Sequence, residues 1–268
     1  SDLVFGTPDE ERTSGKVNFV EAHAFDNIDA VIMCHPCTES EESGTTLGLG
    51  ALQFEFRGIS AHAALPKEDC RNALDALVMS YLNINNLKQY IPGANIYGII
   101  DNGGSRPNII PDYASMKYYI RAASKKKLQE YMDRVAGCVR HTARASGVSV
   151  DVTEFENRVE GLVTNHTLSD VFKENYEKLT TLRLKKPETY AATSDIGNVS
   201  NVVPTIHSWI GITSAGGPAL HNPEFTDATM TDFAAGEMLS AAVAMAQTGY
   251  QVITEPELLQ KIRLEFEK

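Results

Sequence analysis

The hydrophobic pattern of the 268-residue chain changes type twice along its length. Near both ends, apolar runs such as 30–33 and 205–212 are continuous and alternate with helical patterns, which favours a parallel sheet covered on both faces. In between, runs such as 51–56 alternate apolar with polar residues, as expected of strands with one exposed face. The sequence therefore predicts a layered α/β domain that is interrupted by a second domain.

The middle segment has the order of elements of a known motif. An alternating strand is followed by a helical pattern, two strands, a second helix and a closing strand, at 51–56, 69–90, 95–100, 113–122, 124–145 and 148–155. Ser124 is a suitable N-cap for the second helix and Gly147 a suitable stop. The order β-α-β-β-α-β is that of ferredoxin-like domains. We therefore expect an inserted domain at 48–162, between segments 1–47 and 163–268 of the layered αβα domain.

Composition narrows the class of protein. The formal net charge of −11 disfavours binding to nucleic acid or anionic membranes, because both attract basic surfaces. No stretch approaches the ~18–20 consecutive apolar residues of a membrane span. Cys34 and Cys37 form a C-x-x-C pair, but a zinc ribbon usually needs a second such pair. We therefore expect a cytoplasmic protein with reduced cysteines.

Polar side chains follow the apolar runs of the two outer segments. The acids of GTPDEE (6–11) come after 3–5, which we interpret as a short buried strand, and His35 comes after 30–33. His221 lies in a loop rich in Gly and Pro. Since functional residues of parallel sheets gather beyond the carboxyl ends of strands, we expect these side chains to share one site.

The types of residue suggest metal chemistry at that site. Imidazole nitrogen and carboxylate oxygen bind zinc, and a catalytic zinc keeps a position open for water. A nearby glutamate that is not a ligand can take the proton of this water. The alternative for the acids is a solvated loop, which spacing alone favours. A single histidine is usually a surface or hydrogen-bonded residue, and we interpret four in this way: His23, His141, His166 and His207.

Five motifs in register resemble a known family: GTPDEE (6–11), MCHP (33–36), GISAHAALP (58–66), RPNIIPD (106–112) and LHNPEF (220–225). The family is that of the aminoacylase/carboxypeptidase-type di-metal peptidases (clan MH). More narrowly, the chain resembles the amidohydrolase branch, which includes aminobenzoyl-glutamate hydrolases, auxin-conjugate hydrolases and β-alanyl-lysine-type dipeptidases. The motif at 193–204 and the tail at 255–266 are most similar to the first and last of these groups. The resemblance extends over essentially the whole chain.

The resemblance implies roles for residues of the outer segments. It makes Glu10 the general base, and Glu11, His35 and His221 ligands of a divalent metal. The intact enzymes of the branch hold two ions, zinc or manganese. Asp195 orients the site or caps a turn, and we do not count it as a ligand.

The resemblance also implies roles for the inserted domain, which in the family is a dimerising lid. His62 matches the histidine that reaches the active site of the partner subunit and polarises the scissile carbonyl. Asn108 and Arg121 match the residues that hold the substrate carboxylate, for which the guanidinium fork is well suited. Without the resemblance, Asn108 is a turn residue and Arg121 a surface strand residue.

The expected function is therefore hydrolysis of an amide bond adjacent to a free carboxylate, in an N-acyl amino acid, an aminobenzoyl-glutamate-like conjugate or a dipeptide. The expected assembly is a homodimer formed through the lid. The chain departs from the branch in one respect, because it has no upstream H-x-C-G-H segment to supply the other metal ligands. A start near the second half of the catalytic domain would explain this. The alternative is a truncated, non-catalytic dimerising or ligand-binding module with an incomplete metal site.

Overall fold

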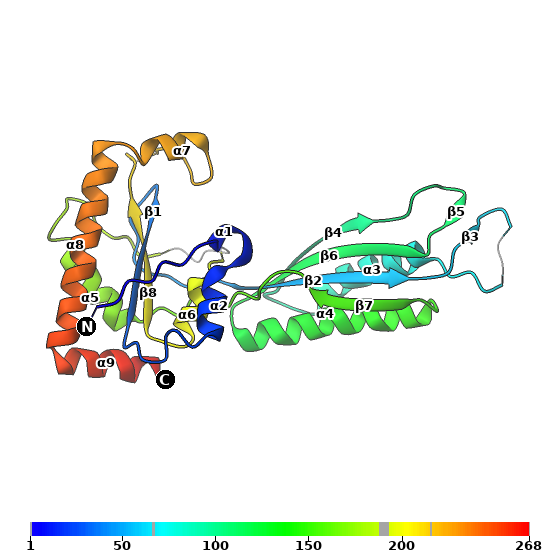
Figure 1. Cartoon of the computed structure of the whole chain (residues 1–268), viewed down its shortest axis with the longest axis horizontal. Helices are drawn as coiled ribbons and strands as arrows, with labels where there is room; N and C mark the ends of the chain where they lie inside the picture. The colour runs from blue at the N-terminus through cyan, green and yellow to red at the C-terminus, as the bar shows by residue number, and fades with distance from the viewer. Residues whose placement is uncertain (1, 66–67, 188–192, 215, 268) are drawn as a thin grey trace. The chain divides into compact units, whose positions relative to one another are not determined.

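The computed structural model describes residues 2–65, 68–187, 193–214 and 216–267. They form two compact units (Figure 1). The outer unit combines Ser1–Thr46 with Leu162–Lys268, and the inserted unit is Leu47–Gly161.

The inserted unit is built on a four-stranded antiparallel sheet with the order β4-β6-β2-β7. The strands are β2 (Gly48–Arg57), β4 (Asn95–Asn102), β6 (Tyr113–Ala122) and β7 (Ser149–Glu154). Helix α3 (Ala73–Lys88) connects β2 to β4, and α4 (Lys125–Ala145) connects β6 to β7. Each βαβ unit is thus split by a strand of the other, which confirms the predicted ferredoxin-like arrangement.

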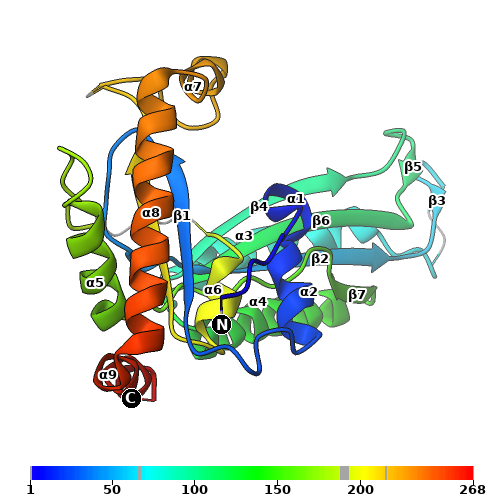
Figure 2. The same cartoon turned by 60° about the vertical axis from the view of Figure 1, so that its left-hand side comes forward.

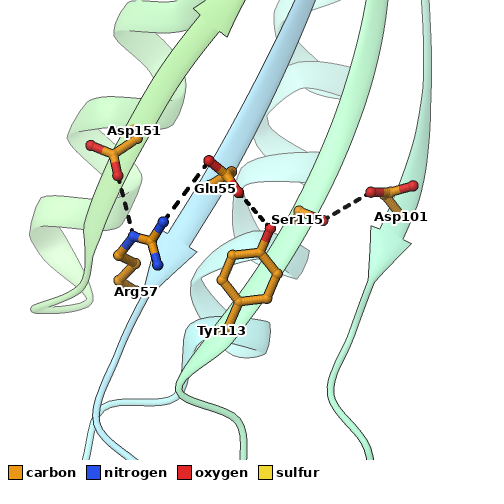
Figure 3. A network of polar contacts seen from close by, with 6 residues as sticks. All are labelled: Glu55, Arg57, Asp101, Tyr113, Ser115 and Asp151. Atoms are coloured by element: carbon orange, nitrogen blue, oxygen red, sulfur yellow. Dashed lines mark hydrogen bonds and ion pairs between the residues drawn. The ribbon is translucent and has the colours of Figure 1, made fainter. Parts of the chain in front are cut away.

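The two faces of this sheet differ in polarity. One face packs on α3 and α4 through side chains that are fully or almost fully buried, among them Phe54, Phe56, Met116, Tyr118, Leu77 and Val135. The opposite face carries a polar network (Figure 3). In it, the Tyr113 hydroxyl donates to Glu55 over 2.6 Å, and Arg57 pairs with Asp151. The alternation along β2 that predicted this strand is therefore the alternation between core and solvent.

The ends of α4 lie where the sequence predicts them. The Ser124 hydroxyl caps the helix by accepting a hydrogen bond from the Lys127 amide over 3.3 Å. Just beyond the helix, Gly147 has a φ of +69°, a left-handed conformation that glycine adopts without strain.

The outer unit has three layers (Figures 1 and 2). Its centre is the parallel pair β1 (Val31–Cys37) and β8 (Thr205–Gly211). One face packs against α5 (His166–Tyr176), α8 (Asp232–Thr254) and α9 (Pro256–Phe266). The other packs against α2 (Gly15–Glu21) and α6 (Ile196–Ser200). The predicted αβα layering is confirmed.

Two local predictions in the outer unit are wrong. Residues 3–5 form no strand, and Leu3 and Val4 are 65% and 99% exposed. A strand needs a neighbour to satisfy its backbone groups, and no described residue pairs with this run. His35 and Pro36 lie within β1 and not beyond its end.

Cys34 and Cys37 do not converge on a common point. They are three positions apart on β1, so their side chains leave opposite faces of the strand. Burial raises the pKa of the Cys34 thiol to about 12, which makes it a poor metal ligand. Both cysteines are free thiols.

The outer unit also has a strand edge without a partner strand among the described residues, and exposed apolar side chains. Among the described residues, β1 forms a ladder with β8 alone, so its other edge has no partner strand. On α8, three large side chains are at least 60% exposed, namely Met238, Leu239 and Tyr250. No helix in the described ranges is both long enough and apolar enough to cross a membrane.

Candidate active site

A cavity of about 780 Å³ in the outer unit is lined by four of the predicted site residues: Glu10, Glu11, His35 and His221. They come from three separate segments of the chain. The structure thus brings together the residues that sequence analysis placed in one site. Trp209, Ser194 and Asp227 also line the cavity.

The loop that carries the two glutamates is tightly constrained. Glu10 and Glu11 open the single-turn helix α1 (Glu10–Thr13), which is flanked by Asp9 at φ 68° and Ser14 at φ 55°. Left-handed conformations are uncommon in residues other than glycine, although aspartate tolerates them better than serine does, and backbone strain is concentrated at functional sites in proteins. The Thr13 hydroxyl donates to the Asp9 carboxylate over 2.5 Å and so closes the turn.

His35 is held with one ring nitrogen directed at the backbone. Its Nδ1 lies 2.7 Å from the carbonyl oxygen of Pro36. Since a carbonyl only accepts, Nδ1 carries the proton, and Nε2 of the neutral ring keeps a lone pair. This is the tautomer that binds a metal through Nε2.

His221 precedes the short helix α7 (Pro223–Ala228) and has a φ of 65°. It is exposed, in the Gly- and Pro-rich loop where the sequence placed it. Three of the four non-glycine residues with positive φ in the described ranges, Asp9, Ser14 and His221, therefore lie in segments that line the cavity or adjoin it.

His207 is a cavity residue that sequence analysis missed. It is only 1% exposed and lines the cavity, and neither of its ring nitrogens has a hydrogen-bond partner among the described residues. Burial, together with the neighbouring His35 and Lys16, lowers its pKa to about 3. The interpretation as a surface or hydrogen-bonded histidine is therefore wrong. The sequence places it on the apolar run 205–212, but its closeness to His35 follows from the register of the parallel pair, in which Trp209 is the partner of His35.

The side chains around the cavity suit a divalent ion chemically, since imidazoles and carboxylates are the ligands of zinc and manganese. The unpartnered ring of His207 is a further polar group that a ligand in the cavity would satisfy. As they stand, no three His, Cys, Asp or Glu side chains within the described ranges are close enough together to hold an ion.

In the inserted unit, the structure brings two of the three predicted residues together. His62 lies on β3 (Ala61–His62), which pairs with β5 (Ile109–Ile110). The amide of Ala63 donates to the carbonyl of Asn108 over 2.9 Å. The amide of Ala64 donates to Nδ1 of His62 over 3.2 Å, so the proton of the neutral ring is on Nε2.

Arg121 is not with them. It lies near the end of β6, opposite Leu49 and Asn95, whereas His62 and Asn108 adjoin the turn that leads into the start of that strand. The eight steps along the chain from Tyr113 to Arg121 span about 26 Å of extended strand.

Comparisons with known proteins find similarity to peptidases and other hydrolases. Residues 45–146 match the peptidase dimerisation domain family, which belongs to the M20 peptidases. The mouse Xaa-Arg dipeptidase is 37% identical over 98% of the chain and 62% of its own length. One of the subunits of the Escherichia coli p-aminobenzoyl-glutamate hydrolase is 27% identical over 98% of the chain and 66% of its own length.

Solved structures share the fold. An aminobenzoyl-glutamate utilization protein from Klebsiella pneumoniae superimposes with a TM-score of 0.67 at 17% identity, over 89% of this chain and 60% of that one. A dinuclear metal-binding M20 peptidase from Bacillus subtilis superimposes with a TM-score of 0.61 at 16% identity, over 90% and 63%. The chain thus spans less than two thirds of the length of these relatives. Residues 45–146 are thus similar to the dimerisation domain of M20 peptidases, and almost the whole chain is similar to hydrolases of this kind.

Proposed function

We propose that the chain carries the lid and part of the active site of a metal-dependent amidohydrolase. The substrate class is an amide bond next to a free carboxylate, in an N-acyl amino acid or a dipeptide. The observation that carries the proposal is the convergence of Glu10, Glu11, His35 and His221 on one cavity. Similarity to a dipeptidase and to an aminobenzoyl-glutamate hydrolase over 98% of the chain supports it.

In this proposal Glu11, His35 and His221 hold a divalent ion, His35 through Nε2. When bound, such an ion lowers the pKa of a coordinated water and so makes it a nucleophile at neutral pH. Glu10, next to a ligand in sequence but with a diverging side chain, accepts a proton and passes it to the leaving amine. His62 presents an Nε2 proton, which suits stabilisation of the oxyanion that forms on the scissile carbonyl.

The substrate carboxylate is assigned to Asn108 and Arg121, but the two lie at opposite ends of β6. A small substrate cannot contact both residues of one chain. We therefore propose a homodimer in which one protomer supplies His62 and Asn108 to a site, and the other supplies Arg121. The dimerisation domain supports this assembly.

The edge strand β4 is the proposed contact surface. Three of its large apolar side chains, Tyr97, Ile99 and Ile100, are 54%, 62% and 46% exposed. The backbone groups on the free edge of β4 can pair with a second copy of the same strand, which extends both sheets.

The proposal is tested by assaying the chain with Zn²⁺ or Mn²⁺ against dipeptides, with release of the free amino acid as readout. Glu10→Gln should lower kcat by at least 100-fold while metal content is unchanged, because Gln cannot accept the proton. Glu224→Gln, at an exposed position in α7, is the matched control. If Glu10→Gln hydrolysed dipeptides at the wild-type rate, Glu10 would be ruled out as the general base.

One observation favours the rival function, a non-catalytic dimerising module: in the described part of the chain, no three potential ligands lie close enough together to hold an ion. Equilibrium dialysis against Zn²⁺ separates the two functions. Tight binding that is lost in Glu11→Gln and His35→Ala supports the enzyme. A dimeric protein that binds no metal and hydrolyses no dipeptide supports the module.

A further inference from the structure

A buried ion pair lies beside the cavity of the outer unit. The Nζ of Lys16 is 2.8 Å from Oδ1 of Asp195, and the backbone amide of Lys16 donates to Oδ2 over 2.9 Å. The two side chains are 7% and 0% exposed. One lysine thus engages both oxygens of the carboxylate. Apolar residues of similar volume often stabilise the contact between two elements as well as a buried ion pair does. The need to pack α2 against α6 therefore does not by itself explain why a charged pair lies there.

The carboxylate of Asp195 does not cap its own helix. It occupies the N-cap position of α6, where an aspartate usually accepts hydrogen bonds from the first turn. The side chain of Asp195 makes no such bond. It bonds instead to a residue that lies 179 positions earlier in the chain.

Lys16 follows the loop of the two glutamates almost directly. Ser14, in its left-handed conformation, and Gly15 separate it from α1. A Cβ atom at Gly15 would lie 2.1 Å from the carbonyl oxygen of Pro8, so the two ends of the loop are pressed against each other. With so short and constrained a connection, the position of Lys16 determines where Glu10 and Glu11 point.

The other end of the ion pair also adjoins the cavity. Ser194, the residue before Asp195, lines the cavity together with Glu10 and Glu11. The ion pair therefore joins two segments of the chain that adjoin the cavity, one next to Glu10 and Glu11 and the other next to Ser194.

We infer that Lys16 and Asp195 are positioning residues, whose ion pair holds the loop of Glu10 and Glu11 against the segment of Ser194 so that the two carboxylates face the cavity. The inference rests on the proposed function only for the roles of these two glutamates. The competing explanation is that the pair merely stabilises the packing of α2 on α6.

Three variants of the full 268-residue chain separate the two explanations. Lys16→Met leaves Asp195 unpaired, Lys16→Arg keeps the charge, and the double variant Lys16→Met/Asp195→Leu replaces the pair by apolar contact. The readouts are Co²⁺ affinity, from the visible absorption of the bound ion, and the urea midpoint of unfolding. We expect Co²⁺ affinity to fall at least tenfold in Lys16→Met and in the double variant. In Lys16→Arg it should stay within threefold of the wild type.

Lys173→Met is the matched control, because it removes a partly buried ion pair with Glu42 elsewhere in the same unit. It should lower the urea midpoint and leave Co²⁺ affinity unchanged. A double variant that folds and binds Co²⁺ like the wild type would overturn the inference. If Lys16→Met does not fold, the double variant alone decides, since it contains no unpaired buried charge.

A wild-type chain that binds no Co²⁺ contradicts the proposed function but leaves the positioning inference testable. Hydrogen exchange of the amides of residues 10–14 then serves as the readout. Protection that persists in Lys16→Arg and disappears in the double variant supports positioning. Equal protection in the wild type and the double variant overturns it.

Discussion

His35 on β1 and His207 on β8 meet edge to face across the parallel pair, with ring centroids 5.8 Å apart and planes inclined by 78°. The first ring is anchored by a hydrogen bond to the backbone, whereas neither nitrogen of the second has a partner in the part of the chain that the structure describes. The two neighbouring imidazoles therefore differ in their effect on the free energy of unfolding. Burying a polar atom without a partner is unfavourable by roughly 1–3 kcal/mol.

The first prediction concerns His207. Replacement by Leu, an apolar side chain of similar size, should raise the free energy of unfolding by about 1 kcal/mol, because two unsatisfied nitrogens are removed. Urea denaturation at pH 7 measures the change. His141→Leu is the control, because the exposed His141 is hydrogen-bonded to the carbonyl of Gly137 and should show no gain. A loss of stability in His207→Leu would show that the imidazole has a partner in solution.

The second prediction concerns Glu265 on α9, whose carboxylate caps α5. It accepts hydrogen bonds from the amides of His166 and Thr167 over 2.6 and 2.9 Å, and from the Thr167 hydroxyl. Burial raises the pKa of Glu265, but these hydrogen bonds outweigh it and lower the pKa below its ordinary value of 4.5. The ionised form is thus favoured in the folded state. Its contribution is complete above pH 4.5 and is lost as the pH falls through the lowered pKa.

Glu265→Gln should therefore destabilise the protein by about 1–2 kcal/mol at pH 7, since hydrogen bonds to a charged group are lost. The difference from the wild type should shrink as the pH is lowered from 5 to 3. Thermal unfolding across this range measures it, with the exposed Glu267→Gln as control. A difference that is the same at every pH would contradict the assignment to the ionised carboxylate.

The third prediction concerns the left-handed conformation of Ser14. Glycine adopts this conformation without a steric cost, whereas other residues are strained in it by roughly 1–2 kcal/mol. Ser14→Gly should therefore stabilise the chain by about 1 kcal/mol, somewhat less than the strain because glycine also gains freedom in the unfolded chain. Ser149→Gly, in the extended strand β7, is the control and should destabilise. Stability equal to or below that of the wild type for Ser14→Gly would argue against a strained loop.

The fourth prediction concerns the edge of β4. Ile99→Lys places a charge on the proposed dimer surface and should shift the chain toward monomer by at least tenfold in the dissociation constant. Analytical ultracentrifugation gives the constant. Leu264→Lys, on a similarly exposed residue of α9 in the other unit, is the control and should leave association unchanged. Equal association of all three proteins would exclude this edge as the contact.

The inserted unit was readable from the sequence because its signals are local. Strand β6 has the bounds predicted for it, since every second residue from Ala114 to Ala122 is buried in the core. Helix α4 begins after Ser124 and ends before Gly147, where a capping hydroxyl and a left-handed glycine specify the boundaries. Each of these signals acts within a few residues and needs no knowledge of distant partners.

The outer unit was less readable because its structure depends on pairing across the chain. The run 3–5 is apolar, but composition does not reveal whether a neighbouring strand exists. His207 comes close to His35 only because β8 pairs with β1 in one particular register. The helices α6 and α7 have five and six residues, too short for a periodic pattern to be detected. The candidate site was found through its motifs, whereas its ion pair and its third imidazole required the structure.

The unpaired edge of β1 has a practical consequence for work with these 268 residues. Alternate residues along this edge present backbone donors and acceptors that no strand in the described part of the chain pairs with. Such an edge is a template on which a second chain adds a strand, and soluble proteins usually cover it. A preparation of this chain can therefore aggregate edge to edge. An inactive sample then does not show that the chemistry of the site has failed. The particle size of each variant should accordingly be recorded in the same buffer as its turnover.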